Sequence, residues 1–199
     1  MYTKEEKQIL LSLARRSIRH YLDTGEKLSE MKENFPQSFW EKMGVFVTLT
    51  IDGALRGCIG NIMPVYPLYK GVIENSVMAA FDDPRFPPIS DDEFDKLNIE
   101  ISVLTVPTPL KYDGKNDLLK KLKPGIDGVV IKKGFNQATF LPQVWDEIKN
   151  PEDFLSHLCA KAGMEPYEWE KGDLEVAIYS VMAFDERELS VPAQSNNFF

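Results

Sequence analysis

Residues 44–60 read GVFVTLTIDGALRGCIG, and this stretch predicts a β-hairpin. Gly44–Ile51 is rich in valine, threonine and other residues that favour strands, and Asp52-Gly53 is typical of a tight two-residue turn. Ala54–Gly60 is then the returning strand. A two-residue turn joins antiparallel neighbours, so this stretch favours an antiparallel sheet.

Three longer helices are predicted outside the hairpin, from their start and stop signals. A capping box of Thr3 and Glu6 precedes helical apolar spacing that ends at Gly25. Proline is favoured at the first position of a helix, which predicts further helices that start at Pro67 and Pro151. Shorter helices are expected at Phe35–Met43, after a cap formed by Ser90 and Glu93, and at Asn116–Leu122.

Further strands are expected at Asn98–Thr105, Gly128–Lys133, Ala138–Leu141 and Leu174–Phe184. In the first of these, Ile99, Ile101 and Val103 alternate and therefore share one face. Hairpins and irregularly placed helices outnumber strand–helix alternation, so the predicted fold class is α+β, with a mostly antiparallel sheet and flanking helices. No linker is evident, so residues 1–199 are expected to form a single domain, and the tail up to Phe199 follows no pattern.

The composition is that of a globular protein, with 43% hydrophobic and 27% charged residues in a chain of 199. A formal net charge of −8 makes nucleic-acid binding through phosphate contacts unfavourable. No apolar run reaches the roughly 18 residues of a membrane span, and the charged N-terminus is unlike a signal peptide. Cys58 and Cys159 are far apart, so reduced thiols in the cytoplasm are expected.

The segment Leu55–Gly60 is the strongest candidate for a functional site. Arg56 and Cys58 lie two residues apart in a strand, so they are expected to share a face, and a cation beside a thiol favours the nucleophilic thiolate. Gly57 and Gly60 leave the thiol without bulky neighbours, and glycine within a strand often marks the close approach of a ligand or another backbone. This predicts a reactive cysteine or an anion pocket. The alternative is a small buried thiol, with Arg56 paired to a surface carboxylate.

The face on which Cys58 lies depends on the register of the hairpin. If Ile51 pairs with Ala54 and the pairing continues without interruption, Cys58 lies on the same face as Val47. A bulge at Gly53 would shift the pairing by one residue and place Cys58 on the other face. Both registers are retained as alternatives.

Further candidate residues lie in the loop 82–88 and in the strand 98–105. Asp83 and Arg85 either contact an anionic ligand or form a salt bridge that holds the proline-rich loop. Glu100 is a catalytic base, a partner of Arg56, or a solvated carboxylate. The segment Phe140–Trp145 is expected to anchor a lobe or a partner surface.

Taken together, these segments resemble the AMMECR domain family, also called protein A of the AmmeMemoRadiSam system. The resemblance runs through almost the whole chain, and Leu55–Gly60 matches the hallmark segment of the family. The other matching segments are residues 44–49, 83–87, 100–104, 139–145 and 161–163. The resemblance implies an α+β fold with a larger and a smaller lobe, closely joined. It also implies association with a MEMO-type protein and a radical SAM enzyme, but no particular reaction.

Two hypotheses of function follow. In the first, the chain is an enzyme or enzyme subunit in which Cys58 is the nucleophile, Glu100 is the base, and Arg56 or Arg85 holds an anionic substrate. In the second, it is a non-catalytic module that binds a MEMO-type protein and a radical SAM enzyme through this region and the Trp145 segment. No cofactor, metal ion or oligomeric state is predicted.

Overall fold

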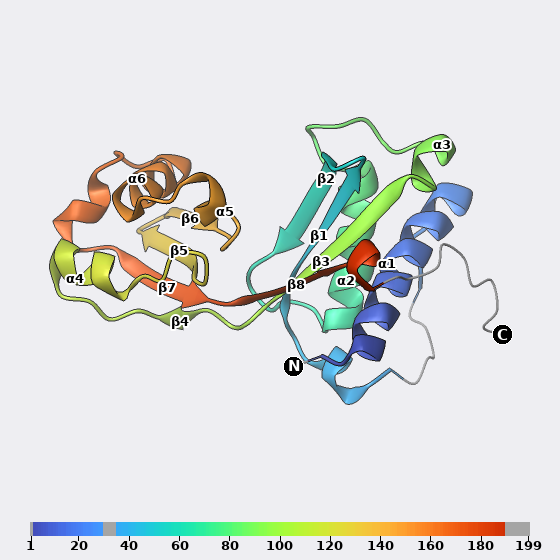
Figure 1. The fold of residues 1–199 in the computed structure, drawn as a ribbon, viewed down its shortest axis with the longest axis horizontal. Coiled ribbons are helices and arrows are strands. Elements are labelled where there is room, and N and C mark those ends of the chain that lie inside the picture. Colours follow the sequence, from blue (N-terminus) through green and yellow to red (C-terminus); the bar gives the residue numbers. More distant parts are fainter. Residues whose placement is uncertain (1, 30–34, 190–199) are drawn as a thin grey trace. The chain divides into compact units, whose positions relative to one another are not determined.

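The computed structural model of the chain describes residues 2–29 and 35–189 (Figure 1). It divides into two compact units. Unit 1 comprises Met1–Leu104 and Met182–Phe199, and unit 2 comprises Thr105–Val181. Each unit has its own hydrophobic core and its own four-stranded sheet, so the predicted α+β class with antiparallel pairing is confirmed.

The sheet of unit 1 is built around the predicted hairpin. Its strand order is β2-β1-β3-β8, with β1 (Gly44–Ile51), β2 (Ala54–Asn61), β3 (Leu97–Leu104) and β8 (Val181–Asp185). β1 pairs antiparallel with both β2 and β3. The turn has positive φ angles at Asp52 (51°) and Gly53 (83°), the conformation that an Asp-Gly turn supplies. The hairpin prediction is therefore confirmed, and β2 is an edge strand.

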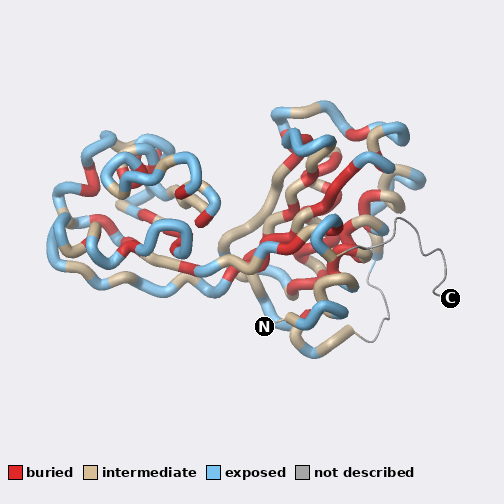
Figure 2. Tube along the Cα trace, viewed as in Figure 1, coloured by how far each residue is buried: buried red, intermediate tan, exposed pale blue. Residues whose placement is uncertain are grey.

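Helices α1 (Lys4–Thr24) and α2 (Leu68–Phe81) cover one face of this sheet, and Figure 1 shows them side by side behind it. The capping box that was predicted at Thr3 is present, and Gly25 ends α1 with a φ of 72°. Buried residues recur along β1 and β3 (red in Figure 2), because every second side chain packs on these helices. The shorter elements are η1 (Gln37–Trp40), α3 (Asp91–Phe94) and α7 (Glu186–Leu189).

A largely buried ion pair joins the first and the last helix of unit 1. Arg15 in α1 donates hydrogen bonds from Nε and Nη2 to the Glu186 carboxylate, both at 2.6 Å. The same arginine donates to the carbonyl oxygens of Phe94 and Leu97, and Glu186 accepts the Ile99 N–H. Both partners thus make hydrogen bonds beyond the ion pair itself, and such bonds help to offset the cost of taking the charges out of water.

Unit 2 contains the strand order β4-β7-β5-β6. Its strands are β4 (Thr108–Pro109), β5 (Gly128–Lys133), β6 (Asn136–Phe140) and β7 (Glu175–Tyr179). Its helices are α4 (Gly114–Lys121), α5 (Val144–Glu147), α6 (Pro151–Lys161) and η2 (Glu168–Lys171). Asn150 caps α6, as predicted, by accepting hydrogen bonds from the N–H groups of Glu152 and Asp153.

The prediction of a single strand at Leu174–Phe184 is wrong. The segment forms two strands, β7 and β8, which are separated by Ser180 and belong to different sheets. The Ser180 N–H donates to the Thr105 hydroxyl, and the Thr105 N–H donates to the Ser180 carbonyl. Apolar alternation continues through the break, so the pattern alone does not reveal it. The tail 190–199 lies outside the described residues.

Candidate functional site

A β-bulge decides on which face Cys58 lies. Ile51 pairs with Ala54 and Thr50 with Leu55, but Leu49 then pairs with Gly57, which leaves Arg56 as the extra residue. Of the two alternative registers, the one shifted by one residue therefore occurs, with the bulge at Arg56 rather than at Gly53. The register places Cys58 opposite Thr48 and not on the face of the buried β1 side chains.

We call the sheet face opposite to α1 and α2 the Thr48 face. A row of three residues crosses it, because Thr48 pairs with Cys58 on one side and with Glu100 on the other. The Thr48 hydroxyl donates a hydrogen bond to the Cys58 sulfur at 3.3 Å. All three side chains are partly exposed. The sequence pattern does not point to Thr48, because its contact with the thiol depends on the register of the bulged hairpin.

Glu100 stands at the other end of this row. Burial, and secondly the charge of Asp185, raise the pKa of its carboxyl group above the ordinary value. Paired Cα atoms in antiparallel strands lie about 4.5–5.5 Å apart, so the Cα atoms of Cys58 and Glu100 are separated by about 10 Å. Thr48 therefore lies between the two groups, and no hydrogen bond joins Cys58 to Glu100 among the described residues. No hydrogen bond joins Glu100 to Arg56 within the described residues.

Asp83 and Arg85 hold the backbone of Cys58. The Cys58 N–H donates to Asp83 Oδ2 at 2.9 Å, and the Cys58 carbonyl accepts a hydrogen bond from Arg85 Nη2 at 3.3 Å. Arg85 also binds both oxygens of Asp83, at 3.0 and 2.7 Å, which holds the pKa of this buried carboxyl far below its usual range. The loop thus provides hydrogen-bond partners for the N–H and C=O groups of Cys58 that point away from the sheet at the edge strand β2. It also forms the salt bridge that was one of the two predicted roles of Asp83 and Arg85.

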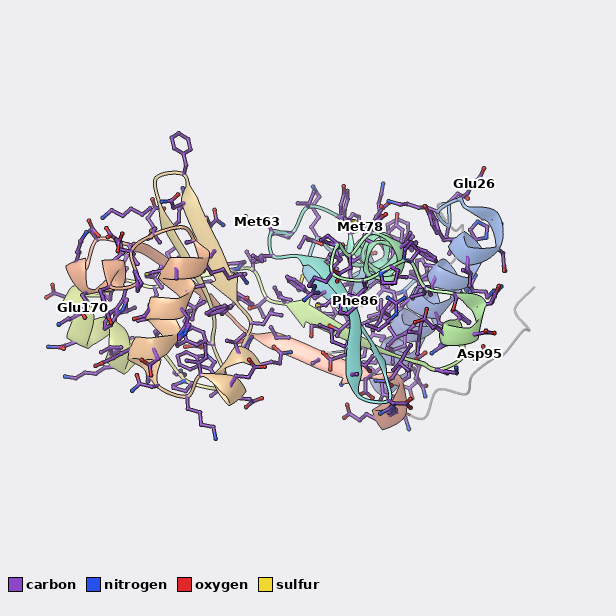
Figure 3. The ribbon with its side chains drawn as sticks, turned by 90° about the horizontal axis from the view of Figure 1, so that it is seen from above. Glu26, Met63, Met78, Phe86, Asp95 and Glu170 are labelled. Atoms are coloured by element: carbon purple, nitrogen blue, oxygen red, sulfur yellow. The ribbon has the colours of Figure 1, made fainter. Side chains whose placement is uncertain are left out.

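Arg56 does not face the thiol, and this corrects the expected pairing of Arg56 with Cys58. Its Nε and Nη2 donate to the two oxygens of Glu93 at 2.7 and 3.0 Å. Arg56 lowers the pKa of Glu93 to about 2. The arginine is buried and packs over the ring of Phe86, which Figure 3 labels, and its Nη1 has no hydrogen-bond partner among the described residues.

The two glycines beside Cys58 are required by packing. A Cβ atom at position 57 would lie 2.0 Å from the carbonyl oxygen of Ala79 in α2. A Cβ atom at position 60 would lie 2.3 Å from the ring of Phe46. A glycine within a strand was expected to mark the close approach of either a ligand or another backbone. At Gly57 it is the backbone of α2 that approaches. The predicted ligand-binding role of both glycines has no contact in this structure that supports it.

The other candidate segments lie in the core of unit 2. Trp145 is buried, stacks on Phe154 at a centroid distance of 3.6 Å, and donates its indole N–H to the Asp127 carbonyl. The segment therefore anchors a lobe and does not present Trp145 as a partner surface. Cys159 is fully buried in α6, and burial raises the pKa of its thiol.

Two general features of the described residues bear on function. No group of three or more His, Cys, Asp or Glu side chains in them is arranged to hold a metal ion. Nor do they contain a helix with the length and apolar character of a membrane span.

Comparison with known proteins identifies the relatives of the chain. The AMMECR1 family model matches residues 11–184. Protein MK0488 of Methanopyrus kandleri is 40% identical over 98% of this chain and 95% of its own length. Protein PF1979 of Pyrococcus furiosus is 42% identical over 90% of this chain and 87% of its own. The crystal structure of uncharacterized protein PH0010 from Pyrococcus horikoshii superposes with a TM-score of 0.86, at 40% identity, over 94% of this chain and 95% of that one. The chain therefore belongs to the AMMECR1 family.

Proposed function

We propose that unit 1 carries a thiol-dependent catalytic site on the Thr48 face. The observation that supports it best is the row of Cys58, Thr48 and Glu100, which brings a nucleophile, a hydrogen-bond donor and an acid–base group onto one partly exposed surface. Leu55–Gly60 supplies the thiol of this site, and neighbouring strands supply the other groups. The alternative of an inert core thiol fits less well, because Cys58 is not buried, unlike Cys159.

In the proposed reaction, the Cys58 sulfur forms a covalent bond with an electrophilic carbon of the substrate. The hydrogen bond from Thr48 stabilises the thiolate that attacks, and the thiol proton is released to solvent. Glu100 donates its proton to the substrate atom that gains the electron pair, and it then recovers a proton from solvent. The raised pKa of Glu100 suits this role, since a larger fraction of the carboxyl groups is protonated near neutral pH.

Labelling of the native protein with iodoacetamide, resolved by mass spectrometry, tests this proposal. Cys58 should react much faster than Cys159, and Thr48→Val should slow it about 2- to 10-fold through the loss of one hydrogen bond. Thr50→Val is the matched control, because Thr50 lies on the same strand and face but pairs with Leu55. Equal, slow reaction of both thiols until the protein is denatured would contradict a functional Cys58.

A second candidate function is that of a binding module for a MEMO-type protein and a radical SAM enzyme. It is favoured by exposed apolar side chains in one loop of unit 1, at Met63 (labelled in Figure 3), Val65 and Tyr66. Val65→Glu should then weaken the calorimetric affinity for the MEMO-type protein of the same organism. Phe135→Glu, at an exposed aromatic residue of unit 2, is the control. Absence of any binding heat at high micromolar concentration would rule out this function.

A further inference from the structure

The two arginines near Leu55–Gly60 differ in what they can reach. Arg56 is 9% exposed and is engaged by Glu93, so its charge is neutralised inside the protein. The side chain of Arg85 is 53% exposed, although its partner Asp83 is only 2% exposed. Because the carboxylate lies inside and the guanidinium outside, the positive end of this pair meets solvent.

Arg85 also retains unused hydrogen-bonding capacity. Its Nε and Nη2 are taken by Asp83, and Nη2 is shared with the Cys58 carbonyl. Its Nη1 makes no hydrogen bond to any part of the chain that the structure describes. An arginine can bind a carboxylate or phosphate through such a remaining edge. The Phe86 ring lies 5.5 Å from the Arg85 guanidinium carbon and supports its orientation.

The position of Arg85 relative to the thiol follows from the bond to the Cys58 carbonyl. The guanidinium that bonds this carbonyl also interacts with the Cys58 side chain, which contributes to the raised pKa of Arg85, so an anion on the Arg85 Nη1 lies within about 10 Å of the sulfur by ordinary bond lengths. This separation corresponds to a small molecule.

On these grounds we infer that the substrate of the Cys58 site is a small anion, with a carboxylate or phosphate group close to its thiol-reactive atom, and that Arg85 binds this group. The inference rests on the proposed thiol chemistry and adds the class of substrate. It assigns the anion contact to Arg85 and excludes Arg56. The sequence alone does not distinguish between these two arginines.

Two reagents that differ in charge test the inference directly. Iodoacetate and iodoacetamide both alkylate a thiol with loss of iodide, the sulfur–carbon bond replacing the carbon–iodine bond and the thiol proton passing to solvent. Only iodoacetate carries a carboxylate. We expect the ratio of the iodoacetate rate to the iodoacetamide rate at Cys58 to be at least about fivefold higher in the native protein than in denatured protein, because pairing of the carboxylate with Arg85 is worth about 1 kcal/mol.

Arg85→Gln should lower this ratio to that of denatured protein. Arg19→Gln is the matched control, because Arg19 is another partly exposed arginine with carboxylate partners, on α1. If Arg85→Gln does not fold, added salt provides the second test with the unmodified protein. Sodium chloride should slow the iodoacetate reaction and leave the iodoacetamide reaction unchanged.

The outcomes separate the inference from the proposed function. Rapid labelling of Cys58 by iodoacetamide, with a rate ratio that neither Arg85→Gln nor salt alters, would overturn the anionic substrate and leave the thiol site standing. Failure of both reagents to label Cys58 in the native protein would overturn both.

Discussion

At the scale of single residues, Glu100 holds a charge in surroundings that disfavour it. Because its pKa is raised in the folded protein, the carboxylate costs stability once the pH exceeds the unfolded pKa of about 4.3, and the full cost is present above the folded pKa. Glu100→Gln should therefore raise the free energy of unfolding at pH 7 and have little effect at pH 3. Urea unfolding at the two pH values measures this. A variant that is less stable than the wild type at pH 7 would show that Glu100 is structurally needed.

The Arg56–Glu93 pair should behave in the opposite way. The pKa of Glu93 is lowered to about 2, so its contribution to stability is present above about pH 4.3 and is lost as the pH falls towards 2. Glu93→Gln leaves the buried Arg56 without a counter-charge and should cost about 3 kcal/mol at pH 7. Asp92→Asn is the control, since Asp92 is exposed on the same helix. Equal stabilities of the two variants in chemical denaturation would refute this account of the pair.

At the scale of elements, the contact between β2 and α2 depends on Gly57. Gly57→Ala should destabilise the protein by about 1–3 kcal/mol, because the Cβ atom would meet the Ala79 carbonyl, and a backbone can move only with its helix. Gly71→Ala, where α2 packs on β1, is the comparison. Its Cβ atom would meet a Val45 methyl group at 2.8 Å, which can shift, and alanine favours the helix. In thermal unfolding, the midpoint temperature of Gly57→Ala should be well below that of Gly71→Ala.

Short-range patterns predicted most elements, because caps, turns and apolar alternation are local properties of the chain. The α1 capping box, the Asp52-Gly53 turn and the Asn150 cap are all confirmed. The bulge at Arg56 could not be predicted, since it depends on how Leu49 and Gly57 meet across strands. For the same reason the pairing of Cys58 with Thr48, and of Arg56 with Glu93, needed the structure. The break at Ser180 could not be predicted, because the alternation of apolar residues is the same whether or not the chain passes from one sheet to another.

At the scale of the whole molecule, unit 2 is one continuous segment inserted between β3 and β8, which are neighbours in the sheet of unit 1. All members of the unit 1 core come from outside residues 105–181. Replacing 105–181 by an Asn-Gly turn should therefore leave a folded unit 1 that unfolds in one transition. Circular dichroism would measure the secondary structure and the unfolding transition of the shortened chain, and the rate of Cys58 labelling would show whether the site is folded. A shortened chain whose Cys58 reacts as fast as in denatured protein would mean that unit 1 needs the insertion.

The ion pair between Arg15 and Glu186 has a consequence for the order in which the protein is made. Its partners lie 171 residues apart, so at roughly 5–20 residues per second a ribosome needs roughly 10–30 s to add Glu186 after Arg15. From the time β3 is complete until β8 is made, the nascent sheet lacks β8, and the edge of β3 is open to pairing with other chains. Unit 1 begins before unit 2 in the chain and is completed only by the strand and helix that follow unit 2.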